Sequence, residues 1–152
     1  MMDKLKLLTI SDDGVPSGFG RISMHINTHA YRRGWDVMAL SLAYDGLLPA
    51  MFNGSPLPYH VGTVQGKPDW PNAVMNVINA WQPDVVLVIQ DFPYGMQIFN
   101  SPADWSQRGR VLITPIDGVP IHPDWLKTVD QTDATMTKIG RASCRERVSD
   151  YV

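Results

Sequence analysis

The fold is decided by the first strand-and-helix unit of the chain, Leu5–Ile10 (LKLLTI) followed by Ser11–Arg21 (SDDGVPSGFGR). The apolar run predicts a buried strand, the glycine-rich segment a turn, and the residues from about 18 to 33 an amphipathic helix. A helix that begins at the carboxyl end of a parallel strand presents unpaired N–H groups, which favour phosphate or another anion. Gly18 and Gly20 lack a Cβ atom, so the backbone can bend there and a ligand can approach closely.

The glycine spacing alone does not decide what this turn does. It reads GxxxGxGR, which is neither the dinucleotide fingerprint GxGxxG nor the P-loop pattern GxxxxGK[ST]. A ligand-binding loop and a plain tight turn therefore both stay open.

Strand and helix signals alternate along the rest of the chain. We expect strands at 35–42, 85–89, 110–116 and 134–137, a short strand near 59–64, and helices at about 70–82 and 122–131. A loop or short helix is expected between 91 and 107, and residues 43–68, rich in Gly and Pro, are the hardest to predict. Repeated βα alternation predicts an α/β fold with a Rossmann-like, doubly wound parallel sheet.

Composition narrows the classes of protein. The chain has 152 residues, 44% hydrophobic and 18% charged, with a formal net charge of −2, which suits one folded domain. The body carries no cluster of Lys and Arg, so nucleic acid is not an expected partner. No apolar run is long enough to span a bilayer, and the start lacks the apolar core of a signal peptide. We expect a cytoplasmic protein.

The last fourteen residues look foreign to the rest. Back-translation of residues 139–148 (IGRASCRERV) resembles a common short-read sequencing adaptor, and the only cysteine, Cys144, lies there. We therefore expect a natural domain over 1–138, a non-native read-through tail over 139–152, and a longer parent protein. Truncation of the natural sequence after residue 138 would expose the sheet edge near 134–137.

Three segments are expected to meet at the carboxyl edge of the sheet, where open α/β folds bind ligands. They are 11–21, 90–95 and 114–122. Carboxylates there can accept hydrogen bonds from paired hydroxyls, and aromatic faces can pack on sugar C–H groups. This predicts a site for a polyol with a phosphate near the first glycine loop. The alternative for each Asp is an Asx turn or a helix cap, which we favour for Asp12 and Asp124.

Other catalytic constellations are weak. His25 and His29 lie one helical turn apart, but HINTH lacks the glutamate of HExxH and no third ligand is evident, so no metal site is expected. A GxSxG nucleophile elbow is absent from the sequence.

Several segments together resemble a known family. The GVPSGFGR turn, the RGWDV stretch at 33–37, PIDGVP at 115–120, PDWL at 123–126 and ATMT at 134–137 are similar to the N-terminal domain of GT-B glycosyltransferases of the retaining family 4 type. Trp35 stands where these enzymes usually have histidine. The resemblance covers roughly residues 4–138.

The resemblance implies transfer of a sugar from a nucleotide-sugar donor to an acceptor hydroxyl, without a metal or other cofactor. It places Gly18, Phe19, Gly20 and Arg21 near the donor phosphates. The acceptor side would hold four residues, of which all but Tyr94 are catalytic candidates: Asp91, Tyr94, Asp117 and His122. It also implies a missing C-terminal Rossmann-like domain as partner. Because leaving-group stabilisation would come from that domain, the present chain is expected to be inactive alone.

Two other interpretations remain. One is a stand-alone Rossmann-like module that binds a nucleotide or a sugar phosphate without catalysis. The other is a different α/β enzyme, such as an epimerase. A dehydrogenase is disfavoured because the glycine spacing differs and Ser41-Leu42 ends the second strand, where an acidic residue would hold the ribose.

Overall fold

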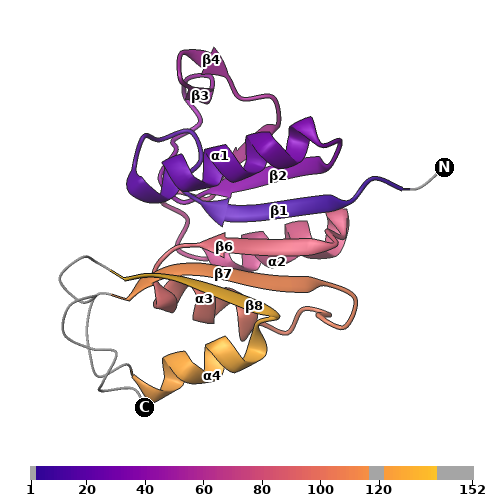
Figure 1. The fold of residues 1–152 in the computed structure, drawn as a ribbon, viewed down its shortest axis with the longest axis vertical. Coiled ribbons are helices and arrows are strands. Elements are labelled where there is room, and N and C mark those ends of the chain that lie inside the picture. The colour runs from indigo at the N-terminus through magenta and orange to yellow at the C-terminus, as the bar shows by residue number, and fades with distance from the viewer. Residues whose placement is uncertain (1–2, 117–121, 140–152) are drawn as a thin grey trace.

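Six parallel strands form one sheet in a computed structural model that describes residues 3–116 and 122–139. In spatial order the strands are β5 (His60–Thr63), β2 (Asp36–Ser41), β1 (Lys6–Ser11), β6 (Val85–Ile89), β7 (Gly109–Ile116) and β8 (Ala134–Ile139). The helices are α1 (Gly18–Arg32), α2 (Trp70–Trp81), α3 (Phe92–Phe99) and α4 (Pro123–Gln131). The predicted α/β, Rossmann-like parallel sheet is confirmed (Figure 1).

The order of the strands creates a switch point between β1 and β6. The chain winds outward from β1 to β2 and β5, then returns through α2 to β6 on the other side of β1 and winds outward again. In such sheets the loops on either side of the switch point diverge and leave a crevice at the carboxyl edge. The loop after β1 and the loop after β6 therefore lie on either side of this point.

The helices divide unequally between the two faces of the sheet. Successive residues of β1 point to opposite faces, so Leu8 packs with α2 and α3 while Leu7 packs on the side of α1. The α2–α3 side forms the larger core and includes partly buried Trp125 and Val129 of α4. On the other face α1 is the only helix among the described residues (Figure 1).

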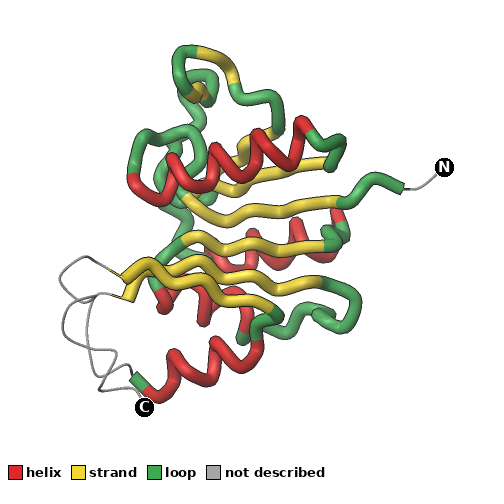
Figure 2. Tube along the Cα trace, in the orientation of Figure 1, coloured by secondary structure: helices red, strands yellow, loops and turns green. Residues whose placement is uncertain are grey.

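The connection from β2 to β5 differs from a usual βαβ crossover. It contains a two-stranded hairpin, β3 (Met51–Phe52) and β4 (Ser55–Pro56), and no helix (Figure 2). Asn53 and Gly54 both have positive φ, as a tight hairpin turn requires. The ring of Phe52 packs edge-on against His25 at 4.7 Å between centroids, which attaches the hairpin to α1.

No described helix combines the length and apolar character needed to cross a bilayer. The expected read-through tail lies outside the described residues except for Ile139, the last residue of β8, so the boundary at 138 stays a prediction.

Candidate phosphate-binding site at the carboxyl edge

Hydrogen bonds join the ends of β1 and β6 at the switch point. The hydroxyl of Ser11 donates to the carbonyl of Ile89 at 3.0 Å. One step further, Gln90 Nε2 donates to Asp12 Oδ1 at 2.6 Å. The two loops that flank the switch point are thus held together by side chains rather than by the sheet ladder.

Asp12 also sets the start of α1. Its second carboxylate oxygen accepts the hydroxyl of Ser17 at 2.8 Å, and the Ser17 Oγ accepts the N–H of Gly20 at 2.9 Å. Ser17 is therefore the N-cap of α1 and satisfies one of the free N–H groups of the first turn. The sequence favoured an Asx turn or a helix cap for Asp12; in the structure the cap is Ser17, and Asp12 supports it by accepting the hydroxyl of Ser17.

Gly20 and Gly18 have different surroundings. A Cβ atom on Gly20 would lie 2.1 Å from the carbonyl oxygen of Val15 and 2.7 Å from that of Asp12, both backbone atoms. A Cβ on Gly18 would meet nothing within 4 Å. Gly20 is needed for the turn itself, whereas Gly18 leaves open space at the first position of the helix.

The first turn of α1 is available to an anion. Among the hydrogen bonds of the described residues, none uses the N–H of Gly18 or Phe19. The first turn carries no acidic residue, and the exposed Arg21 follows directly. These N–H groups and the positive end of the helix dipole favour a phosphate at this point.

A buried carboxylate stands behind this turn. Asp13 is fully buried, and it accepts hydrogen bonds from Tyr59 OH at 2.7 Å, from Asn27 Nδ2 at 2.9 Å and from Ser23 Oγ. Burial raises the pKa of Asp13, although these hydrogen bonds oppose the rise. Burial likewise raises the pKa of Tyr59. Thr9 extends the cluster by donating to Asn27 Oδ1 at 2.7 Å.

Sequence reasoning missed this cluster of Asp13, Ser23, Asn27 and Tyr59. Ser23 and Asn27 are four residues apart on α1, and both are fully buried polar residues in a helix. This pair is the sequence signal from which a polar cluster could have been predicted, because residues four apart lie on one face of a helix. Tyr59, far along the chain, gave none.

The remaining predicted site residues are spread along the same edge. Asp91 is the exposed N-cap of α3 and makes no side-chain capping bond. Tyr94, 36% exposed, packs against Trp70 with 5.7 Å between ring centroids. His122 is the N-cap of α4, and its Nδ1 accepts the N–H of Asp124 at 3.2 Å. Asp117 lies outside the described residues.

The two histidines of α1 are separated by their environments. Both line a groove on the sheet face, but the ring of His25 also packs on Phe52 of the hairpin. No group of three or more His, Cys, Asp or Glu that could hold a metal occurs within residues 3–116 and 122–139.

Comparison with known proteins gives fold-level matches only. No protein-family model matches the chain, and no curated protein is similar to it at a significant level. A putative NADPH:quinone reductase from Mesorhizobium loti is 15% identical with a TM-score of 0.50, over 92% of this chain and 37% of that one. An alcohol dehydrogenase superfamily protein from Novosphingobium aromaticivorans is 16% identical with a TM-score of 0.47, over 91% of this chain and 36% of that one.

A third solved structure, CurK enoyl reductase, is 14% identical with a TM-score of 0.43, over 94% of this chain and 38% of that one. The chain thus spans little more than a third of the length of each of these structures. At such low identity the likeness to the quinone reductase supports the fold and nothing finer.

These comparisons overturn the glycosyltransferase prediction. The solved structure that reaches a TM-score of 0.50 is a putative NADPH:quinone reductase and not a glycosyltransferase, so the GT-B family assignment, the glycosyltransferase activity and the nucleotide-sugar donor with a hydroxyl acceptor were wrong. The second glycosyltransferase domain expected as partner is withdrawn with them. The physical reason is that a strand, a glycine turn and a helix are shared by all Rossmann-like sheets, so those motifs identify the layout but not the chemistry.

Proposed function

We propose that this domain is a nucleotide-binding module that holds the phosphate of its ligand on the first turn of α1. One observation carries the proposal: the N–H groups of Gly18 and Phe19 have no partner among the described hydrogen bonds and lie at the switch point of the sheet. Phosphates bind at such points because the N–H groups and the helix dipole both act on the anion.

The surroundings of the turn support the same ligand. Asp12, the nearest carboxylate of the loop, already accepts hydrogen bonds from Ser17 and Gln90, so its charge is partly offset by donors. The open space at Gly18 leaves room for a phosphate to approach the backbone. Arg21 adds an exposed positive charge beside it.

The end of β2 lacks the acidic residue that usually binds the ribose in NAD domains. The hydroxyl of Ser41, at the end of β2, is buried and accepts the N–H groups of Tyr44 at 3.0 Å and Ala43 at 3.4 Å. It offers no carboxylate to a ribose 2′-hydroxyl, the contact common in NAD domains. NADPH is the first nucleotide to test because one structure of similar fold is a putative NADPH:quinone reductase. ADP and a sugar phosphate complete the panel.

The location of the protein belongs to the same proposal. Residues 1–138 contain no cysteine, so this part of the chain forms no disulfide. This composition suits a cytoplasmic nucleotide-binding protein.

The test is calorimetric titration of the full chain with NADPH, ADP and a sugar phosphate, repeated with Gly18→Leu. The leucine would occupy the open space without disturbing packed atoms, so we expect binding to weaken by about tenfold or more, ~1.4 kcal/mol. Gly109→Ala is the control, because a Cβ there makes only ordinary contacts at the opposite edge of the sheet. Unchanged affinity in Gly18→Leu, or no binding by the parent chain, would refute the proposal.

A further inference from the structure

One face of the sheet is only half covered. α1 packs on β1 and β2 and reaches β6, while β7 and β8 have no described helix above them on this side. Val85 and Val111 are half-buried, and Met136, which lies beside Ile113 on the same face, is 58% exposed. Parallel sheets are normally covered by helices on both faces, so this strip is an apolar surface without its covering layer.

A groove of about 470 Å³ runs between α1 and this strip. Its floor and inner wall are apolar and come from β1, β6, β7, α1 and the residue before β2: Leu7, Val85, Leu87, Val111, Ile26, Ala30 and Trp35. The groove lies toward the N-terminal ends of the strands, because Leu7, Val85 and the residue before β2 line it. It is therefore separate from the phosphate site, which lies at the carboxyl edge.

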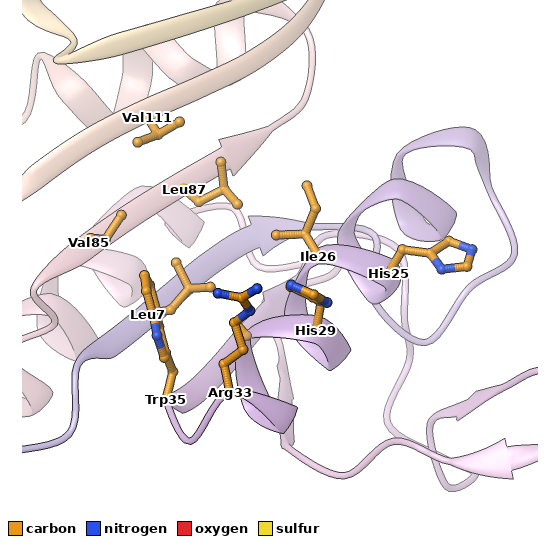
Figure 3. A pocket seen from close by; sticks show the side chains of 10 residues that line it. Leu7, His25, Ile26, His29, Arg33, Trp35, Val85, Leu87 and Val111 are labelled. Atoms are coloured by element: carbon orange, nitrogen blue, oxygen red, sulfur yellow. The ribbon is translucent and has the colours of Figure 1, made fainter.

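The rim of the groove is basic. Figure 3 shows the guanidinium of Arg33 and the ring of His29 directed toward the groove, and His25 lines it at the end near the hairpin, where its ring packs on Phe52. Within the described residues neither Arg33 nor His29 takes part in a salt bridge. Arg33 is permanently charged and His29 offers a ring N–H, so this side of the groove favours carboxylates.

The dimensions suit a helix. Strands in a sheet lie about 4.8 Å apart and packed helices 8–10 Å apart, so each helix covers about two strands. With α1 over β1 and β2, the next helix position falls over β6 and β7. We propose that this groove is the docking site for an amphipathic helix of a partner polypeptide, with an apolar face toward Leu87 and Val111 and acidic residues toward Arg33 and His29.

The test uses two synthetic amphipathic peptides of about 18 residues, roughly 27 Å as helices, a little longer than α1. Both carry the same apolar stripe. One has glutamates on the flank that would face Arg33, and the other has lysines at the same positions. Binding to the full chain is followed by calorimetry and by the methyl NMR signals of Leu7, Leu87 and Val111. We expect the glutamate peptide to bind about threefold to tenfold more tightly, since exposed ion pairs contribute modestly.

Charge reversal supplies the matched controls. Arg33→Glu is expected to reverse the preference in favour of the lysine peptide, while Arg32→Glu, the same change on the neighbouring residue that does not line the groove, is expected to leave it unchanged. Val111→Glu is expected to abolish binding of both peptides.

Three results would overturn the proposal. Equal binding of both peptides would show that the basic rim selects nothing. Binding of neither peptide, with self-association that Val111→Glu removes, would assign the groove to a second copy of the chain. Binding of neither peptide without self-association would leave the groove without a helical partner. None of these readouts depends on nucleotide binding, so this inference and the proposed function can fail separately.

Discussion

Gly18 and Gly20 stand two residues apart in the same turn but have different physical tasks. Gly20 is confined by the carbonyl oxygens of Val15 and Asp12, so its missing side chain makes the turn possible. Gly18 faces open space, so its missing side chain leaves the helix N-terminus accessible. One glycine therefore serves folding, and the other serves the proposed ligand.

This separation makes a prediction about stability. Gly20→Ala is expected to lower the free energy of unfolding by about 1–3 kcal/mol, because two backbone oxygens must move to admit the Cβ. Gly18→Ala is expected to be neutral or to stabilise by up to about 1 kcal/mol, since alanine is the better helix residue. Urea unfolding of both variants measures the difference. Equal losses in the two variants would contradict the assignment.

The sequence indicates both glycines but not their difference. The pattern shows that two residues without Cβ occur in a turn, which both tasks require. Which one is enclosed depends on where the carbonyl oxygens of Val15 and Asp12 lie, and that follows from the cap formed by Ser17 with Asp12 and Gly20. Short-range pattern carries no information on that geometry.

At the scale of elements, Asp13 connects three parts of the fold. It follows β1 in sequence, contacts α1 through Ser23 and Asn27, and contacts the long β2–β5 connection through Tyr59. Because all four residues are buried, the hydroxyls of Ser23 and Tyr59 depend on this one carboxylate, while Asn27 Nδ2 also donates to Ser23 Oγ at 3.3 Å. We infer that the cluster fixes the position of α1, and therefore of its N-terminus, against the sheet.

Substitution of Asp13 is expected to change the free energy of unfolding and its dependence on pH. Asp13→Ala leaves buried donors without an acceptor and is expected to cost about 2–4 kcal/mol of unfolding free energy. Asp13→Asn is expected to cost less, because its carbonyl can accept from Tyr59 and Asn27 while its amide donates to Ser23. Denaturant unfolding of both variants and the parent measures these losses.

The pH dependence follows from the direction of the shift. The pKa of Asp13 in the folded chain lies above its ordinary value of 3.8, so the folded state keeps the proton where the unfolded chain has released it. The stability due to this group is therefore fully present below 3.8 and falls as pH rises through the folded-state pKa. Relative to the parent, Asp13→Asn should gain stability as the pH rises from about 3.8 through the folded-state pKa of Asp13. If the difference in unfolding free energy between Asp13→Asn and the parent does not change with pH, a raised pKa for Asp13 is contradicted.

The elements themselves were largely predictable, with one instructive omission. The β-branched run of β6 and the proline-started α2 agree with their sequence signals, because local propensity and burial point the same way. The hairpin within 43–68 was not expected, although Asn53-Gly54 is a strong tight-turn signal. Its strands are only two residues long, which is too short for alternation to appear.

At the scale of the molecule, the sheet separates two surfaces. The carboxyl edge at the switch point carries the polar loops and the free N–H groups of α1, and the half-covered face carries the apolar groove toward the opposite edge. Alternating strands and helices predict the parallel sheet and its ligand-binding edge because few parallel topologies are allowed, but they do not predict the half-covered face. The chemistry is not predicted in the same way, since the residues that choose between ligands occupy loops whose geometry is set by long-range contacts such as Gln90 with Asp12. The glycosyltransferase prediction went wrong at that step.

The measurement that tests the central claim most directly is an amide NMR titration of the full chain with NADPH and with ADP. The account predicts saturable shifts at the N–H groups of Gly18 and Phe19, with little change at Val111 on the groove floor. A titration in which both nucleotides leave the Gly18 and Phe19 signals in place would contradict nucleotide binding at the N-terminus of α1.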